Sequence, residues 1–330
     1  MVLTDPYGRP LLNLRIALTK PCNLHCSYCH GEGEDKNIEN PAREMTCEEI
    51  IRIAKIATSL GISRIKLTGG EPLLRKDILQ IVKGIASLQG LEELSMTTNG
   101  TLIAPIAKEL HANGLKRVNI SLPTIDGETY CKLTGGRLDD VLEGVKAAVE
   151  AGLNPVKLNM LILRDVNDHQ IFEMIDFARE TGAILQLIEL EPINISWEYY
   201  SAYYKPLDEY EEMLKQKALK VENRRFMQNR RIYHLPNVKV EVVHPIENTD
   251  FCQNCTRLRV TSDGKLKPCL MRNDNTIDIL TPIRKGAKDE ELIALFKLAN
   301  QRRQPYNKNK QSHIENIRAI SFRLKPGFTD

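Results

Sequence analysis

The sequence predicts an α/β protein built on parallel strands, either a doubly wound sheet or a full or partial barrel. Six short β-rich runs alternate with helical stretches over the first two-thirds of the chain. Strands that alternate with helices indicate parallel pairing through helical crossovers. Cysteine, glycine and polar residues also follow the ends of several runs, and parallel folds build their sites at the carboxyl ends of strands.

The expected elements follow one another in a regular order. The first strand covers residues 12–18, and the first helix begins at Thr46, where Glu49 completes a capping box. The other expected strands cover residues 64–67, 93–97, 117–122, 156–163 and 185–190. The other expected helices begin near residue 77 and cover residues 104–112, 139–151 and 168–180.

A domain boundary is expected at Pro192, where a tyrosine-rich segment breaks the strand–helix rhythm. This divides the chain into residues 1–191 and residues 192–330. The later part is more basic and less periodic, but residues 257–267 read as a hairpin whose tight turn is Asp263-Gly264. The polar, basic tail from residue 302 to residue 330 is expected to be partly mobile.

Composition limits the classes of protein that need to be considered. The chain has 330 residues, of which 42% are hydrophobic, and this is typical of a soluble protein with a sizeable core. It contains no run near the roughly 20 apolar residues that cross a bilayer. The amino-terminal residues lack the basic and apolar regions of a signal peptide, so a cytoplasmic location is expected. A net charge of +3 does not indicate nucleic acid as a partner.

Eight cysteines are expected to be reduced thiols in that compartment. Cys47 and Cys131 stand alone and are interpreted as ordinary buried or half-buried residues. The other six form two trios: Cys22, Cys26 and Cys29 near the start, and Cys252, Cys255 and Cys269 near the end.

The first trio has the spacing C-x3-C-x2-C and follows the first strand. A cubane of four irons normally takes four thiolates, so three ligands leave one iron open to an outside donor. A zinc site completed by His25 or His30 is the alternative.

The second trio has the spacing C-x2-C-x13-C and spans the expected hairpin. A zinc ribbon would need a fourth ligand, and the nearest upstream candidate is His244. Three thiolates around a second open cluster fit the spacing better.

The first trio and its surroundings resemble the radical S-adenosylmethionine (SAM) superfamily. The features that carry the resemblance are Tyr28 before the last cysteine and Gly69-Gly70-Glu71-Pro72 after the second strand. The resemblance implies a partial (βα)6 TIM-like barrel with a smaller C-terminal cluster-binding domain. It also implies that the open iron binds the amino and carboxylate groups of SAM, whose cleavage releases a 5′-deoxyadenosyl radical.

The chain as a whole, over roughly residues 10–300, resembles the GTP 3′,8-cyclase family within that superfamily. The matching stretches, in order, are residues 14–19, 68–73, 97–100, 119–122, 157–159 and 251–259, followed by Cys269. The resemblance implies two [4Fe–4S] clusters, with SAM at the first and the guanine of GTP at the second.

The family's ligand-binding residues map onto particular positions of this sequence. For SAM they are Tyr28, Gly70, Ser121 and Glu191. For GTP they are Arg15, Lys66, Thr97, Lys157, Arg257, Leu258 and Arg259. Basic side chains suit a triphosphate, because guanidinium groups bind phosphate in a bidentate geometry. The resemblance also assigns Arg257 and Arg259 a catalytic role in quenching the final radical.

The implied reaction is the first step of molybdenum cofactor biosynthesis. The deoxyadenosyl radical takes hydrogen from ribose C3′ of GTP, the carbon radical attacks C8, and an electron and a proton complete (8S)-3′,8-cyclo-7,8-dihydroguanosine 5′-triphosphate. The expected partners are GTP, an external electron donor and a downstream cyclic pyranopterin monophosphate synthase that receives the product. A homodimer is possible; no membrane or nucleic acid is expected.

Three positions depart from the family pattern. Lys66 stands where arginine is common, Glu191 stands where methionine is common, and the chain ends in residues 325–330 without the Gly-Gly of bacterial members. One alternative is another two-cluster radical SAM enzyme that acts on a peptide. A second is a non-enzymatic metal-binding protein that grips nucleic acid, which predicts steeply salt-dependent binding and no use for the Gly-Gly-Glu-Pro motif.

Overall fold

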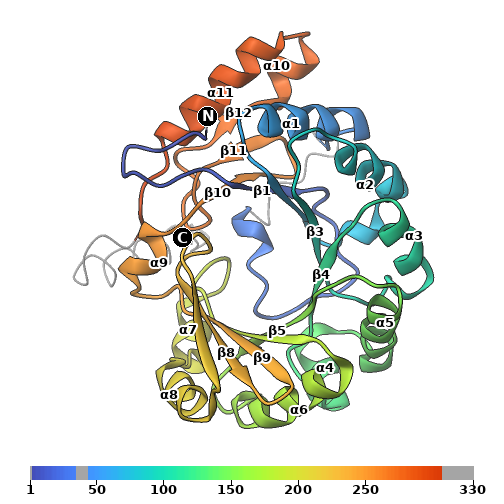
Figure 1. The fold of residues 1–330 in the computed structure, drawn as a ribbon, viewed down its shortest axis with the longest axis vertical. Coiled ribbons are helices and arrows are strands. Elements are labelled where there is room, and N and C mark those ends of the chain that lie inside the picture. Colours follow the sequence, from blue (N-terminus) through green and yellow to red (C-terminus); the bar gives the residue numbers. More distant parts are fainter. Residues whose placement is uncertain (1, 35–43, 307–330) are drawn as a thin grey trace, which may run out of the picture.

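One continuous sheet organises the molecule. The computed structural model describes residues 2–34 and 44–306. Within these ranges, twelve strands form a single sheet in the order β12-β11-β10-β1-β2-β3-β4-β5-β6-β9-β8-β7. The strands curve around an interior that the segment after β1 crosses, and the helices lie outside them (Figure 1). The result is an open barrel, as expected for this fold class.

The six strands expected in the first part are confirmed, and each pairs in parallel with the next. They are β1 (Asn13–Ala17), β2 (Arg64–Thr68), β3 (Glu93–Thr98), β4 (Arg117–Ser121), β5 (Val156–Ile162) and β6 (Ile184–Glu189). The helices are α1 (Cys47–Ser59), α2 (Ile78–Ala86), α3 (Ala107–Ala112), α4 (Gly127–Thr134), α5 (Leu138–Glu150) and α6 (Ile171–Thr181).

The helix ends differ from the prediction in two places. Residues 104–106 and 168–170 form 3₁₀ turns that precede α3 and α6 instead of belonging to them. The capping box at Thr46 is confirmed. Helix α4 was not predicted: it has eight residues, too few to show a clear period, although Asp126 caps it by accepting the Thr129 amide at 2.8 Å.

The second part of the chain extends both edges of the same sheet. Its elements are α7 (Trp197–Tyr203), α8 (Asp208–Lys217), β7 (Lys220–Arg224), β8 (Arg230–Leu235), β9 (Val238–Val243), α9 (Thr249–Gln253), β10 (Arg257–Val260), β11 (Lys265–Lys267), β12 (Ile277–Asp278), α10 (Leu280–Arg284) and α11 (Asp289–Gln301). Strand β9 pairs in parallel with β6, and β10 pairs in parallel with β1. The hairpin of β10 and β11 is confirmed, with Gly264 at φ 74° in its turn.

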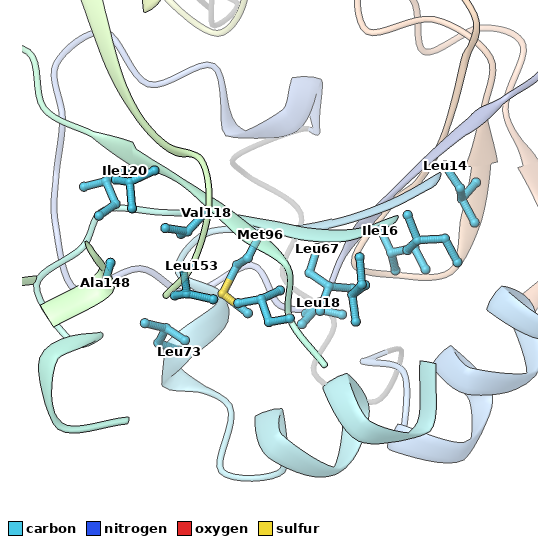
Figure 2. Packing of buried hydrophobic residues seen from close by; sticks show 14 of the residues in the cluster. Leu14, Ile16, Leu18, Leu67, Leu73, Met96, Val118, Ile120, Ala148 and Leu153 are labelled. Carbon is cyan, nitrogen blue, oxygen red and sulfur yellow. The ribbon is translucent and has the colours of Figure 1, made fainter. Parts of the chain in front are cut away.

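Each strand of the barrel has one apolar and one polar face. Leu14, Ile16, Leu67, Met96 and Val118 are buried between the sheet and the outer helices, as Figure 2 shows. Because side chains alternate along a strand, the residues between them face the barrel interior. These inner residues are largely charged or amide side chains, so the interior is built to bind polar groups.

No helix in the described ranges is both long and apolar enough to cross a membrane. The expectation of a mobile tail falls mainly on residues 307–330, which lie outside the described residues.

Glycine at position 144 lets α5 pack against the turn that follows β3. A Cβ there would lie 2.1 Å from the carbonyl oxygen of Gly100, which is a backbone atom that cannot rotate away. We expect Gly144→Ala to destabilise the protein by about 1–3 kcal/mol, as overpacking does. Chemical denaturation of both proteins measures the change.

Gly127→Ala is the matched control, because a Cβ at Gly127 has open space around it. It should leave the free energy of unfolding unchanged or raise it slightly. Equal effects of the two substitutions would contradict the proposed packing role of Gly144.

Candidate active site

The carboxyl ends of the strands open into a cavity of about 310 Å³ that both cysteine trios line. The two trios are more than 220 positions apart in the sequence, and the parallel pairing of β10 with β1 brings them together. Predicted residues that line this cavity are Cys22, Cys26, Cys29, Cys252, Cys255, Cys269, Arg15, Tyr28, Gly70, Thr97, Ser121, Glu191, Arg257 and Arg259.

The loop of the first trio is held by α4 and by the end of β3. The amide of His25 donates to Thr134 O at 2.9 Å, and the amide of Ser27 donates to Leu133 O at 3.0 Å. The Asn99 side chain donates to Asn23 Oδ1 at 2.8 Å. Residues 22–29 are therefore anchored on two sides while the cysteines face the cavity.

Gly69 and Gly70 lie in close contact with the backbone of residues 19–21, which leads into the first cysteine trio. A Cβ at Gly70 would lie 2.1 Å from Pro21 O and 2.2 Å from Lys20 O, immediately before the first cysteine. Gly69 has a φ of 149° and a similar conflict with Thr19 O. These two glycines therefore allow the cysteine loop to pack directly on the end of β2.

Glu71 of the same motif is fully buried and joins its own loop to the end of β3. Its carboxylate accepts the Thr98 hydroxyl at 2.7 Å, the Asn99 amide at 2.8 Å and the Leu73 amide at 3.0 Å. Burial raises its pKa, although these hydrogen bonds oppose the shift. The motif thus fixes the ends of β2 and β3 relative to the first trio.

Two arginines hold the loop of the second trio by its backbone. Arg9 Nη1 donates to Cys252 O at 2.8 Å, and Arg303 Nη2 donates to Cys255 O at 2.5 Å. Asp5 lies 2.7 Å from Arg9 Nε and 3.5 Å from Arg303 Nη1. Burial raises the pKa of Cys255, but the charges of Arg303 and Arg257 outweigh it and hold this pKa below its ordinary value. A lowered pKa favours the thiolate, which is the form that binds metal.

In the described residues, no three His, Cys, Asp or Glu side chains converge on one point to hold a single metal ion. In a cubane each thiolate binds a different iron, so such convergence is not required. His30 Nδ1 accepts the Glu32 amide at 3.0 Å, and His244 Nε2 lies 3.3 Å from Glu189 Oε1.

The two solitary cysteines differ from each other. Cys47 is buried, as expected, whereas Cys131 is exposed on α4. The expectation that both are at least half-buried is therefore wrong for Cys131, because its position on that unpredicted helix faces outward.

The basic residues of the site stand side by side across the inner face of the sheet. The pairing register places Arg259 beside Arg15 and Arg15 beside Lys66. Lys66 and Lys157 line a second, smaller cavity of about 30 Å³ toward the amino ends of the strands. Arg15 and Arg257 line both cavities, so the cationic surface runs from one into the other.

Buried Glu241 on β9 gathers three of these cations. Its carboxylate forms an ion pair with Lys157, and it lies 3.0 Å from Arg224 Nη1 and 3.3 Å from Arg230 Nη1. Burial opposes ionisation, but the charges of Arg230 and Lys157 hold the pKa of Glu241 well below its ordinary value. Glu241 therefore fixes this part of the basic surface as a permanent counter-ion.

Lys66 and Lys157 both lie among other cations. Burial, reinforced by Arg117 and Arg15, lowers the pKa of Lys66 well below its ordinary value. Burial lowers the pKa of Lys157 to about 8, although Glu241 opposes the shift. Like charges without a counter-ion disfavour the protonated form. A polyanion in the barrel would relieve this repulsion.

Leu258 differs from the other predicted ligands because its side chain is fully buried in the outer apolar cluster. Alternation along β10 turns Arg257 and Arg259 inward and Leu258 outward. Any ligand contact from Leu258 is therefore limited to its backbone.

Several cavity residues were not anticipated from the sequence. Glu32 pairs with Arg259, Gln228 enters the cavity from the turn between β7 and β8, and Arg230 enters it from the first position of β8. Burial opposes ionisation of Glu32, but Arg259 and Arg15 lower its pKa to about 2. Arg117 and Asn119 could have been predicted from the sequence. They alternate with Ser121 along one strand, which places all three side chains on the same face of the sheet. Gln228 lies in a turn, which follows no such period, and Arg230 begins a strand that was not predicted.

Glu189, at the end of β6, is fully buried and also lines the cavity. It accepts the backbone amide of Leu207 at 3.3 Å and that of Ile246 at 3.4 Å. Its neighbours also include His244 and Tyr204. Burial raises its pKa from 4.5 to about 8 despite these hydrogen bonds.

Comparisons with known proteins match both parts of the chain. Residues 16–178 match the Radical SAM superfamily, and residues 183–309 match the family described as Molybdenum Cofactor Synthesis C. A probable GTP 3′,8-cyclase of Pyrococcus horikoshii is 49% identical over 92% of this chain and 98% of its own length. One of Methanocaldococcus jannaschii is 44% identical over 93% of this chain and 100% of its own length.

Solved structures show the same fold at low sequence identity. Streptococcus suis SuiB bound to S-adenosylmethionine has a TM-score of 0.63 at 20% identity, covering 83% of this chain and 65% of that one. The AdoMet-bound protein anSMEcpe has a TM-score of 0.57 at 18% identity, covering 94% of this chain and 97% of that one.

The pKa of Glu189 makes stability depend on pH. A carboxyl with a raised pKa in the folded state stabilises below its unfolded pKa, and that stabilisation is lost as pH rises through the folded value. The relevant window runs from 4.5 to about 8. We expect Glu189→Gln to gain stability relative to the wild type as pH rises through this window, as measured by urea unfolding.

Exposed Glu143 on α5 provides the control. Glu143→Gln should keep the wild-type dependence on pH. A constant difference between Glu189→Gln and the wild type across the window would contradict the raised pKa.

Proposed function

The chain belongs to the GTP 3′,8-cyclase family of the radical SAM superfamily, and from this we propose how its residues bind the cofactors and GTP. Its activity is the radical cyclisation of GTP to (8S)-3′,8-cyclo-7,8-dihydroguanosine 5′-triphosphate, the first step of molybdenum cofactor biosynthesis. The observation that carries the residue assignments is the cavity shared by both cysteine trios and the basic residues.

We assign one [4Fe–4S] cluster to each trio. Cys22, Cys26 and Cys29 would hold the first, and Cys252, Cys255 and Cys269 would hold the second. Three thiolates on each leave one iron open on each cluster. The support is that both trios line the same cavity, so a molecule bound in that cavity could be reached from either cluster.

SAM is proposed to lie on the side of the first trio, against Tyr28, Gly70, Ser121 and Glu191. All four line the main cavity. Glu191 brings a carboxylate where methionine is common in the family, and such a group can accept hydrogen bonds from a ligand. When bound, SAM and the first cluster supply the 5′-deoxyadenosyl radical that removes hydrogen from ribose C3′ of GTP.

GTP is proposed to place its triphosphate on the basic inner face and its guanine toward the second trio. The triphosphate contacts would come from Arg15, Lys66, Lys157 and the Arg257–Arg259 stretch, with Thr97 nearby in the cavity. Opposite charge supports this orientation, because the phosphates would neutralise cations that repel one another. Arg257 and Arg259 are the proposed catalytic residues, since they lie between the basic face and the second trio.

The remaining assignments complete the proposal. Residues 1–191 would carry the first cluster and residues 192–330 the second, although one sheet joins them. An external reductant supplies electrons, and a cyclic pyranopterin monophosphate synthase receives the product; a homodimer is possible. A cytoplasmic location is proposed because six ligand thiols need a reducing compartment.

The central test separates the two clusters. Replacing Cys252, Cys255 and Cys269 with alanine should lower bound iron from about eight to about four ions per chain and abolish the cyclic product. Iron analysis and mass spectrometry of anaerobic reactions with SAM, dithionite and GTP measure both. Cys131→Ala is the control, because that thiol is exposed on α4. Full iron content in the triple variant would refute the second cluster.

A second test concerns the charge of Lys157. Because its pKa is about 8 in the absence of ligand, and the triphosphate prefers the protonated amine, GTP affinity should fall as pH rises above that value. Arginine keeps its charge at these pH values, so Lys157→Arg should weaken this dependence, as measured by equilibrium dialysis. Exposed Lys116→Arg is the control. An unchanged pH dependence in Lys157→Arg would remove Lys157 from the triphosphate site.

A further inference from the structure

The carboxylate of Glu32 already contacts two of the arginines that are proposed to bind phosphate, Arg15 and Arg259. Glu32 Oε2 lies 2.5 Å from Arg259 Nη1, and Glu32 Oε1 lies 3.6 Å from Arg15 Nη1. The Glu32 side chain is 12% exposed and lines the main cavity. An anion inside a site for a polyanion is unfavourable for binding, so its presence calls for a physical explanation.

The backbone of Glu32 adopts a left-handed conformation that is unusual for a residue with a side chain. Glu32 has a φ of 52°, between Gly31 at 53° and Gly33 at 70°. Left-handed conformations are unfavourable for residues other than glycine, and strained residues of this kind concentrate at functional sites. Glycine at position 32 would adopt this conformation more readily. The presence of glutamate there therefore indicates that its carboxylate has a role.

The surrounding loop holds the carboxylate in place. The Asn194 side chain donates to His30 O at 2.9 Å and to Glu34 O at 2.7 Å, on either side of Glu32. The Glu34 carboxylate accepts the Ser262 amide at 2.9 Å, which ties the loop to the turn after β10. These hydrogen bonds therefore hold Glu32 in a fixed position in the cavity wall.

Glu32 and Glu241 play different roles although both bind cations. Glu241 is fully buried beneath the basic face and does not line the main cavity. Glu32 lines that cavity together with Arg15 and Arg259. A ligand that enters can therefore replace the Glu32 contacts without displacing Glu241.

We propose that Glu32 is an internal competitor for the substrate's phosphates and so determines the specificity of the site. Its carboxylate pairs with Arg15 and Arg259 until several phosphate charges replace it. A ligand with few negative charges gains too little from the arginines to displace it. This inference rests on the proposed function, because it requires that these arginines bind the triphosphate.

The test compares three ligands that share different parts of GTP. GTP, inorganic triphosphate and guanosine are titrated into the anaerobically reconstituted holoenzyme by equilibrium dialysis. Glu32→Gln removes the charge and keeps the shape, and Glu32→Gly removes the side chain and suits the left-handed backbone. Both should bind GTP and inorganic triphosphate about tenfold more tightly, the scale of one charge-assisted hydrogen bond. Guanosine affinity should not change.

Two controls separate charge from loop structure. Glu32→Asp keeps the negative charge and should not reproduce the gain. Glu34→Gln weakens the anchor to Ser262 but keeps the competing carboxylate, so it should not tighten binding either. The KM for GTP should fall in Glu32→Gln with the same sign as the dissociation constant.

The outcomes distinguish failure of this inference from failure of the proposed function. Weaker or unchanged binding of inorganic triphosphate by Glu32→Gln and Glu32→Gly would overturn the competition and leave the triphosphate site intact. Equal tightening of guanosine would also overturn it, because guanosine has no phosphate. If the wild-type holoenzyme binds neither GTP nor inorganic triphosphate, both the placement of GTP and this inference fall.

Discussion

The parallel pairing of β10 with β1 is the constraint on which the site depends. It joins the last part of the chain to the first strand, in a register that puts Arg259 beside Arg15. The cysteines before and after β10 thereby reach the cavity that the first trio lines. Without this ladder the chain would hold two separate half-sites. Proximity of two bound reactants can lower a reaction barrier by about 7–11 kcal/mol. The pairing of β10 with β1 creates the single cavity in which two reactants could lie close together.

The barrel reverses the usual distribution of polarity in a parallel sheet. Parallel strands buried on both faces normally read as continuous apolar runs, but here only the outer face is apolar. The inner face carries Arg15 on β1, Lys66 on β2, Asn119 on β4 and Lys157 on β5. Such an interior gains stability only when its charges are matched. Glu241 matches part of them permanently, and Glu32 pairs with Arg15 and Arg259 in the free protein. The bound nucleotide is proposed to take the place of Glu32.

Strands and helices were predictable where their periods were long enough to read, and the cysteine loops were predictable from their spacing. Helix α4 was missed because its eight residues carry too short a pattern. The contacts of Glu32 and Arg230 could not be predicted, because each depends on a partner more than ten positions away. Glu32 also lies in a short turn without periodicity, and Arg230 begins a strand that was not predicted. Leu258 shows the opposite case: alternation along its strand indicated an outward side chain, and the motif match concealed it.

The distance in sequence between β1 and β10 also constrains how the protein is made. Residues 18–256 separate the two strands, so β1 leaves the ribosome long before its second partner exists. During that interval one edge of β1 has unpaired backbone groups, which are a template for aggregation. The first cysteine loop is likewise complete while the second trio is still unmade. The cavity that both trios line therefore cannot form until residues 252–269 have been synthesised.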